Sequence, residues 1–185
     1  NVSRFGLGAE LFVKGLAKKV LLADNLSALY AGICGHSQMS VFTAWIGILA
    51  YTMQLYFDFS GYSDMAIGLG KMLGFDFNKN FDYPYISTSV SEFWRRWHIS
   101  LGSWFRDYIY IPLGGNRVST LKHVRNILIV WALTGLWHGA SWNFVIWGLY
   151  FGLFIFIEQK IGKKKMKKIP IVLRHIYNKI VIIIG

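Results

Sequence analysis

Apolar residues recur every three to four positions in the first part of the chain. Between residues 7 and 31 they include Leu11, Leu16, Val20 and Leu21, and lysines gather close to them. This spacing is typical of an amphipathic helix, and a basic polar side suits the surface of a membrane. The pattern predicts a helix over 7–31 that lies on a membrane surface or ends a membrane span.

A second apolar stretch predicts a membrane-crossing helix. Residues 41–57 carry no charge, and their length is at the short limit for crossing a bilayer. The segment from Asp58 to Asp64 then brings in two carboxylates, two serines and a glycine, so we expect the helix to be interrupted there. A glycine-rich helical piece is expected to follow as far as Gly74, and the turn-forming residues of 75–88 predict irregular structure.

The spacing of Ser89 and Glu92 matches a capping box, which marks the start of a helix. The residues that follow predict one helix over 92–111, with the sequence EFWRRWHISLGSWFRDYIYI. The face of this helix that we expect to be largely aromatic carries Trp94, Trp97, His98, Leu101, Trp104 and Phe105. A turn at 112–117 is expected next.

The pattern of residues 126–157 predicts a helical hairpin. Residues 126–138 and 142–157 are apolar, residues 139–141 can turn, and basic residues flank both outer ends. By the positive-inside rule both outer ends are cytoplasmic. Each arm of roughly 15 residues would measure about 22 Å against a hydrocarbon core of about 30 Å, so the tip with His138 stays inside the membrane. The alternative is one long tilted helix over 126–157, which also keeps His138 deep.

The composition agrees with a membrane protein. Of the 185 residues 54% are hydrophobic and 16% charged, and the mean hydropathy is +0.38. The net charge of +11 comes from Lys and Arg at the ends of apolar segments, which argues against nucleic acid as a partner. The lone Cys34 allows no disulfide. We therefore expect an all-α, polytopic protein with one domain over 1–185, as an internal piece of a longer chain.

Two histidines are candidates for chemistry. An imidazole inside a membrane is costly unless it is paired or lines a cavity, so His138 is a functional candidate. Neutral histidine can accept the proton of a hydroxyl, as acyl transfer to an alcohol requires. The alternative is that His138 bonds a neighbouring helix. His98 lies on an aromatic face, where a lone histidine is more often structural.

The charged candidates allow two interpretations each. Arg95 and Arg96 could bind a phosphate of an acyl donor, or they could meet lipid headgroups. Asp58 and Asp64 could orient groups on facing helices, or they could cap the following helix. The residues that we expect to bind donor or acceptor are Trp94, Arg95, Arg96, Asp58 and Asp64. The sequence has no His or Cys at metal-ligand spacing beside these carboxylates, so no metal is expected. It has no nucleophile elbow and no P-loop, so a serine acyl-enzyme and a nucleotide hydrolase both lack support.

Four segments resemble the membrane-bound O-acyltransferase superfamily, and within it the branch of alginate O-acetylation proteins. They are YFDFSGYSDMAIGLGKMLGF, NFDYPYIS, SEFWRRWHISLGSWFRDYIYIPLGGNR and GLWHGASWNFVIWG. The D-alanyl transfer proteins of teichoic acid modification look more distant. The resemblance covers most of residues 5–160, in order.

The resemblance implies a function and a mechanism. His138 in Trp-His-Gly would be the catalytic residue, and His98 in Trp-Arg-Arg-Trp-His a second residue tied to activity. The fold would be a ring of helices around a thinned centre in a bacterial plasma membrane. The donor would be acetyl-coenzyme A or a carrier-bound acyl thioester, with no bound cofactor. The acceptor would be a polysaccharide hydroxyl, and an extracytoplasmic acetylase is a partner in related systems.

Two other functions fit a chain of this kind. In a transporter, His98, His138, Asp58 and Asp64 would form a proton or ion relay, although no internal repeat supports this. In a scaffold of a polysaccharide export complex, changing His138 would leave acetylation intact.

Overall fold

The computed structural model describes residues 2–36 and 38–185, which fall into two compact units, 1–80 and 81–185. Among these residues the regular structure is helical, with one isolated bridge between Phe81 and Trp97. The all-α prediction is therefore confirmed. One helix in the described part, Trp142–Ile161, is long and apolar enough to cross a membrane, so a multi-pass arrangement stays a prediction. The single domain expected over the whole chain also stays a prediction.

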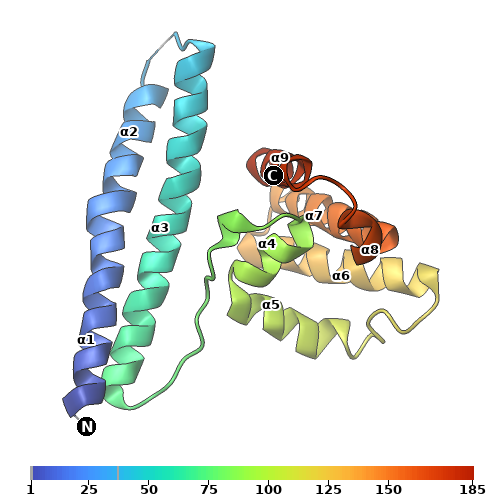
Figure 1. The fold of residues 1–185 in the computed structure, drawn as a ribbon, viewed down its shortest axis with the longest axis horizontal. Coiled ribbons are helices and arrows are strands. Elements are labelled where there is room, and N and C mark those ends of the chain that lie inside the picture. The colour runs from blue at the N-terminus through green and yellow to red at the C-terminus, as the bar shows by residue number, and fades with distance from the viewer. Residues whose placement is uncertain (1, 37) are drawn as a thin grey trace. The chain divides into compact units, whose positions relative to one another are not determined.

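The first unit is a long antiparallel pair of helices (Figure 1). Its elements are α1 (Val2–Ala17), a π-helical stretch (Lys18–Ala23), α2 (Asp24–Cys34) and α3 (Val41–Leu73). Glycines allow the backbones to meet, because a Cβ added at Gly15 would lie 2.5 Å from the Gly61 carbonyl oxygen. The predicted helix over 7–31 is confirmed and extends further at both ends.

The predicted interruption between Asp58 and Asp64 is wrong, because α3 runs through it as one helix of 33 residues. Glycine weakens a helix by only about 1 kcal/mol, and here Ser60 and Gly61 are buried, with Gly61 packed against α1. The two carboxylates cap no helix. Asp58 pairs with Lys19 at 2.8 Å and Asp64 pairs with Lys18 at 2.6 Å.

The second unit holds short helices against a hairpin and a C-terminal helix (Figure 1). Its elements are a 3-10 turn (Pro84–Ile86), α4 (Val90–Arg96), α5 (Ile99–Phe105), a π-helical stretch (Arg106–Tyr110), α6 (Thr120–His138), α7 (Trp142–Ile161), α8 (Lys163–Met166) and α9 (Ile171–Ile184). Its buried apolar core is formed by Val90, Phe151, Ile155 and Val181.

The predicted hairpin is confirmed, and the single long helix over 126–157 is excluded. Helices α6 and α7 turn at Gly139–Ser141 and pack closely, because Gly148 faces the Trp131 carbonyl and leaves no room for a Cβ. The arms have 19 and 20 residues, or about 28 and 30 Å. The expectation of short arms is therefore wrong, because polar residues at the start of α6 and at the end of α7 are also part of these helices. The depth of His138 in a membrane stays a prediction.

The predicted helix over 92–111 is also wrong, because it breaks at Trp97 and His98. Trp97 is extended (φ −108°) and His98 is left-handed (φ +47°). The break forms because the Asp82 N–H donates to the Arg96 carbonyl at 2.9 Å, and Phe81 bridges to Trp97. The start of α4 follows the prediction: the Ser89 hydroxyl accepts from the Glu92 N–H at 3.1 Å.

Candidate active site

The structure brings the two candidate histidines to one cavity. His138 ends α6, and His98 lies at the break between α4 and α5. Both line a cavity of about 420 Å³ in the second unit. The centre of the Trp137 ring is 5.5 Å from that of His98 and 4.9 Å from that of His138. Two residues that the sequence singled out separately are therefore neighbours.

His98 adopts a backbone conformation that non-glycine residues rarely hold. Its φ of +47° and ψ of +55° are left-handed, and such conformations persist where the surroundings fix them, often at functional sites. The side chain is half-buried. Burial lowers the pKa of His98 to about 4, and the nearby His138 also lowers it. The imidazole is therefore neutral at pH 7, the form that accepts a proton.

His138 lies where α6 ends and the hairpin turns. Its ring centre is 4.7 Å from that of Trp147, in an edge-to-face arrangement, and 6.2 Å from that of Phe144. A Cβ at Gly139 would lie 2.6 Å from the Phe144 ring, so glycine is needed for this turn to pack. His138 is exposed in the described part of the protein while still lining the cavity, which fits a position at its opening.

The cavity wall is mainly apolar, with a few polar groups. Trp94 lines it and meets Trp131 edge to face, with the ring centres 5.1 Å apart. Walls of this kind are typical of sites for small organic ligands. The lining residues that sequence reasoning missed include Arg106, Tyr110, Thr134 and Gln159. Thr134 could have been found, because it lies one helical turn before His138 and therefore on the same face of α6.

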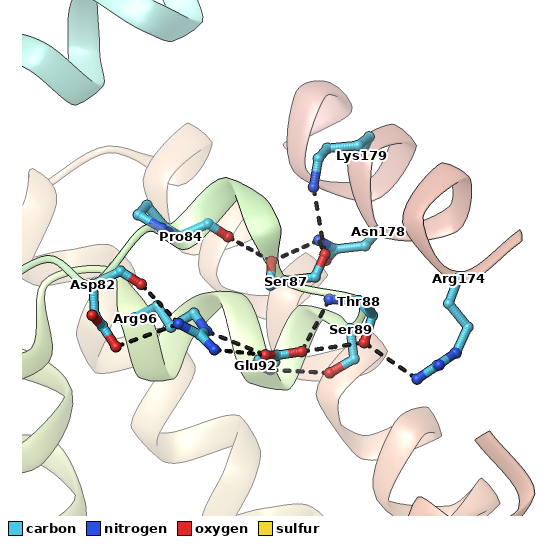
Figure 2. Close-up of polar contacts among 10 residues, drawn as sticks. All are labelled: Asp82, Pro84, Ser87, Thr88, Ser89, Glu92, Arg96, Arg174, Asn178 and Lys179. Atoms are coloured by element: carbon cyan, nitrogen blue, oxygen red, sulfur yellow. Dashed lines mark hydrogen bonds and ion pairs between the residues drawn. The ribbon is translucent and has the colours of Figure 1, made fainter. Parts of the chain in front are cut away.

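The two neighbouring arginines have different surroundings. Arg95 is exposed and lines the cavity, whereas Arg96 is not among the lining residues. Figure 2 shows that the Arg96 guanidinium donates to the Asp82 carbonyl (3.0 Å) and pairs with Glu92 (3.1 Å). Arg96 thus connects the end of α4 to the segment before it. Donor binding by either arginine stays a prediction.

The remaining predicted residues lie in the first unit. Asp58 and Asp64 hold lysines, as described above, and their role in binding a substrate stays a prediction. Over residues 2–36 and 38–185, no group of three or more His, Cys, Asp or Glu side chains is arranged to hold a metal ion.

The described residues form a helical structure with one helix long and apolar enough to cross a membrane, and two histidines meet at one largely apolar cavity. These features define the class of helical proteins with a histidine-lined site. The family can be stated as well. The model of the MBOAT, or membrane-bound O-acyltransferase, family matches residues 4–180, and the chain belongs to this family. The resemblance seen in the sequence is confirmed.

Named relatives fall into three groups. The chain is 49% identical over 185 residues to the probable alginate O-acetylase AlgI of Pseudomonas aeruginosa, covering 100% of this chain and 36% of that protein. It is 45% identical over 161 residues to the peptidoglycan O-acetyltransferase of Helicobacter pylori (86% and 30%). It is 35% identical over 131 residues to the teichoic acid D-alanyltransferase of Bacillus subtilis (65% and 33%). The chain therefore spans about a third of the length of these relatives.

Proposed function

We propose that this chain is part of a bacterial plasma-membrane O-acyltransferase that transfers acetyl groups to hydroxyls of a cell-surface polysaccharide. The observation that carries the proposal is the meeting of His98 and His138 at one cavity. The names of the relatives support the reaction class, because the two compared over the largest shares of the chain are an O-acetylase and an O-acetyltransferase. The D-alanyltransferase matches less of the chain at lower identity.

In the proposed reaction, His138 is the general base. Its neutral imidazole takes the proton of an acceptor hydroxyl while the hydroxyl oxygen attacks the carbonyl carbon of an acetyl thioester. The new C–O bond forms as the C–S bond breaks, and the proton passes from His138 to the leaving thiolate. His98 assists by relaying the proton or by positioning the donor. The donor is acetyl-coenzyme A or a carrier-bound acyl thioester.

The cavity has parts that suit such a donor. Trp94 and Trp131 provide apolar surface for the acetyl group and its thioester, and Arg95 provides a cation for an anionic phosphate. Basic residues beside α7 suit anionic lipid headgroups on the cytoplasmic side. The acetyl group reaches the polysaccharide directly or through an extracytoplasmic acetylase partner.

The test measures acetyl esters on cell-surface glycans in cells carrying the full-length protein. His138→Ala is expected to lower the ester content by on the order of 100-fold or more, because a general base is lost. His36→Ala is the matched control, since His36 is exposed in the first unit. Membrane abundance is matched by immunoblot. Unchanged ester with normal abundance would contradict the proposal and favour transport or scaffolding.

A further inference from the structure

We propose that Glu158 of α7 is a positioning residue for His98, within the acyl transfer proposed above. Glu158 is only 6% exposed, and it is not among the residues that line the cavity. It therefore touches neither donor nor acceptor in the cavity. Its carboxylate instead holds the helix that leads to His98.

The carboxylate accepts two hydrogen bonds from the backbone at the start of α4. The Val90 N–H donates to Oε1 at 2.7 Å and the Ser91 N–H donates to Oε2 at 2.8 Å. The first N–H groups of a helix have no partner within it, and they carry partial positive charge. Hydrogen bonds of this kind to a carboxylate are short and strong. Glu158 thus fixes the first turn of α4.

Burial of a carboxylate is expensive, so the contacts that it makes indicate its role. Each of its oxygens faces one N–H group, which a glutamine could not reproduce, because its amide would turn an NH2 group toward one of the two donors. Tyr177 of α9 is close enough to interact with the same carboxylate. The position therefore requires a carboxylate.

The consequence for the site follows from the order of the elements. Helix α4 has seven residues, and His98 follows it after the single extended residue Trp97. His138 belongs to the hairpin of α6 and α7, and Glu158 belongs to α7. Glu158 thus links the helix that presents His98 to the hairpin that presents His138. The relative position of the two imidazoles depends on this link.

The segment before α4 is held in place by a residue of α9. Asn178 is fully buried and donates to the Ser87 carbonyl (3.0 Å) and to the Ser87 hydroxyl (2.8 Å), as Figure 2 shows. The far end of α4 is held by Arg96 and Asp82. With the rest of α4 held in this way, Glu158 fixes its first turn against α7.

The experiment measures the position of His98 directly. Full-length protein with Glu158→Gln is purified in detergent and treated with diethyl pyrocarbonate, and labelling rates of individual histidines are read by mass spectrometry. We expect the His98 rate to change while the rates of His36 and His138 stay at their wild-type values. Glu10→Gln, which removes an exposed carboxylate of the first unit, is the matched control and should change none of them.

Acetyl-ester content is the second readout. At normal abundance Glu158→Gln is expected to lower it by up to about 100-fold, because a small displacement of a catalytic group is costly. Labelling does not depend on acetyl transfer, so it tests the role of Glu158 even where the proposed function fails. An unchanged His98 rate in well-folded Glu158→Gln, or equal changes at all three histidines, would overturn the proposal.

A second substitution, Glu158→Asp, tests the proposal if Glu158→Gln does not fold. Where Glu158→Gln does not accumulate, Glu158→Asp keeps a carboxylate that is one methylene shorter. We expect it to restore abundance while still changing the His98 rate. Wild-type labelling in folded Glu158→Asp would show that the carboxylate serves folding alone, and the proposal would be rejected.

Discussion

The carboxylates of the first unit pair with lysine and arginine side chains, whereas two carboxylates of the second unit accept hydrogen bonds from backbone N–H groups. Asp58, Asp64 and Asp76 pair with Lys19, Lys18 and Arg4 at 2.6 to 2.8 Å. Glu158 accepts hydrogen bonds from the Val90 and Ser91 N–H groups. Glu92 accepts one from the Thr88 N–H in addition to its ion pair with Arg96. Exposed side-chain pairs are worth little, while buried acceptors of backbone N–H groups fix geometry.

This difference between the two units shows where the backbone needs polar contacts to hold its conformation. The first unit is a pair of long helices that glycine contacts already bring together. The second unit contains a helix break at His98, and irregular backbone needs partners for its polar groups. Polar contacts are therefore concentrated around α4, close to the cavity.

The largest expected effect is a loss of acetyl ester when a histidine of the second unit is removed. His98→Ala should lower acetyl-ester content by on the order of 100-fold, because a residue at the reacting groups is lost. His36→Ala, in the first unit, should leave the ester content unchanged. Glycan ester assays at matched abundance check both variants, and equal ester in wild type and His98→Ala would contradict the catalytic role.

The next effect separates the two neighbouring arginines. Arg96→Gln should lower the free energy of unfolding by about 1–3 kcal/mol, because the Asp82 carbonyl and Glu92 lose a charged donor. Arg95→Gln is the matched control and should change stability by less than about 0.5 kcal/mol. Thermal unfolding in detergent measures both. A raised donor KM in Arg96→Gln at unchanged stability would show instead that Arg96 binds the donor.

The stability contributed by Glu92 of the second unit is expected to depend on pH. Burial raises the pKa of Glu92, but hydrogen bonds from Thr88 and Arg96 outweigh it and bring the pKa below its ordinary value of 4.5. Because the folded-state pKa is the lower one, this stabilisation is present above about pH 4.5 and is lost as the pH falls through the folded pKa. Glu92→Gln should therefore lose less thermal stability than wild type on acidification. Equal losses would show that Glu92 does not contribute.

The smallest effect is expected in the first unit. Asp58→Asn breaks a pair whose side chains are 41% and 46% exposed, so it should cost less than about 1 kcal/mol. Ester content should change little at matched abundance. A large loss of ester without a loss of stability would instead support the predicted role of Asp58 in substrate binding.

Much of the fold could be predicted from local pattern. The first helix, the hairpin and the start of α4 follow from apolar spacing, basic flanks and a capping serine. The continuity of α3 could not be predicted, because it depends on glycines of α1 more than forty residues away. The break at His98 likewise depends on Phe81 and Asp82. The histidines were predicted singly, but their common cavity needs the tertiary structure.

The contact between Glu158 and α4 also has a consequence for synthesis. Val90 leaves the ribosome 68 residues before the carboxylate that accepts its N–H. At about 5–20 residues per second, that interval is roughly 3–14 s. During this time α4 has no partner in α7. The hydrogen bond between Ser87 and Asn178 can form only later, because Asn178 follows Glu158 in the chain. Nascent chains therefore complete the site only after the second arm of the hairpin has been made.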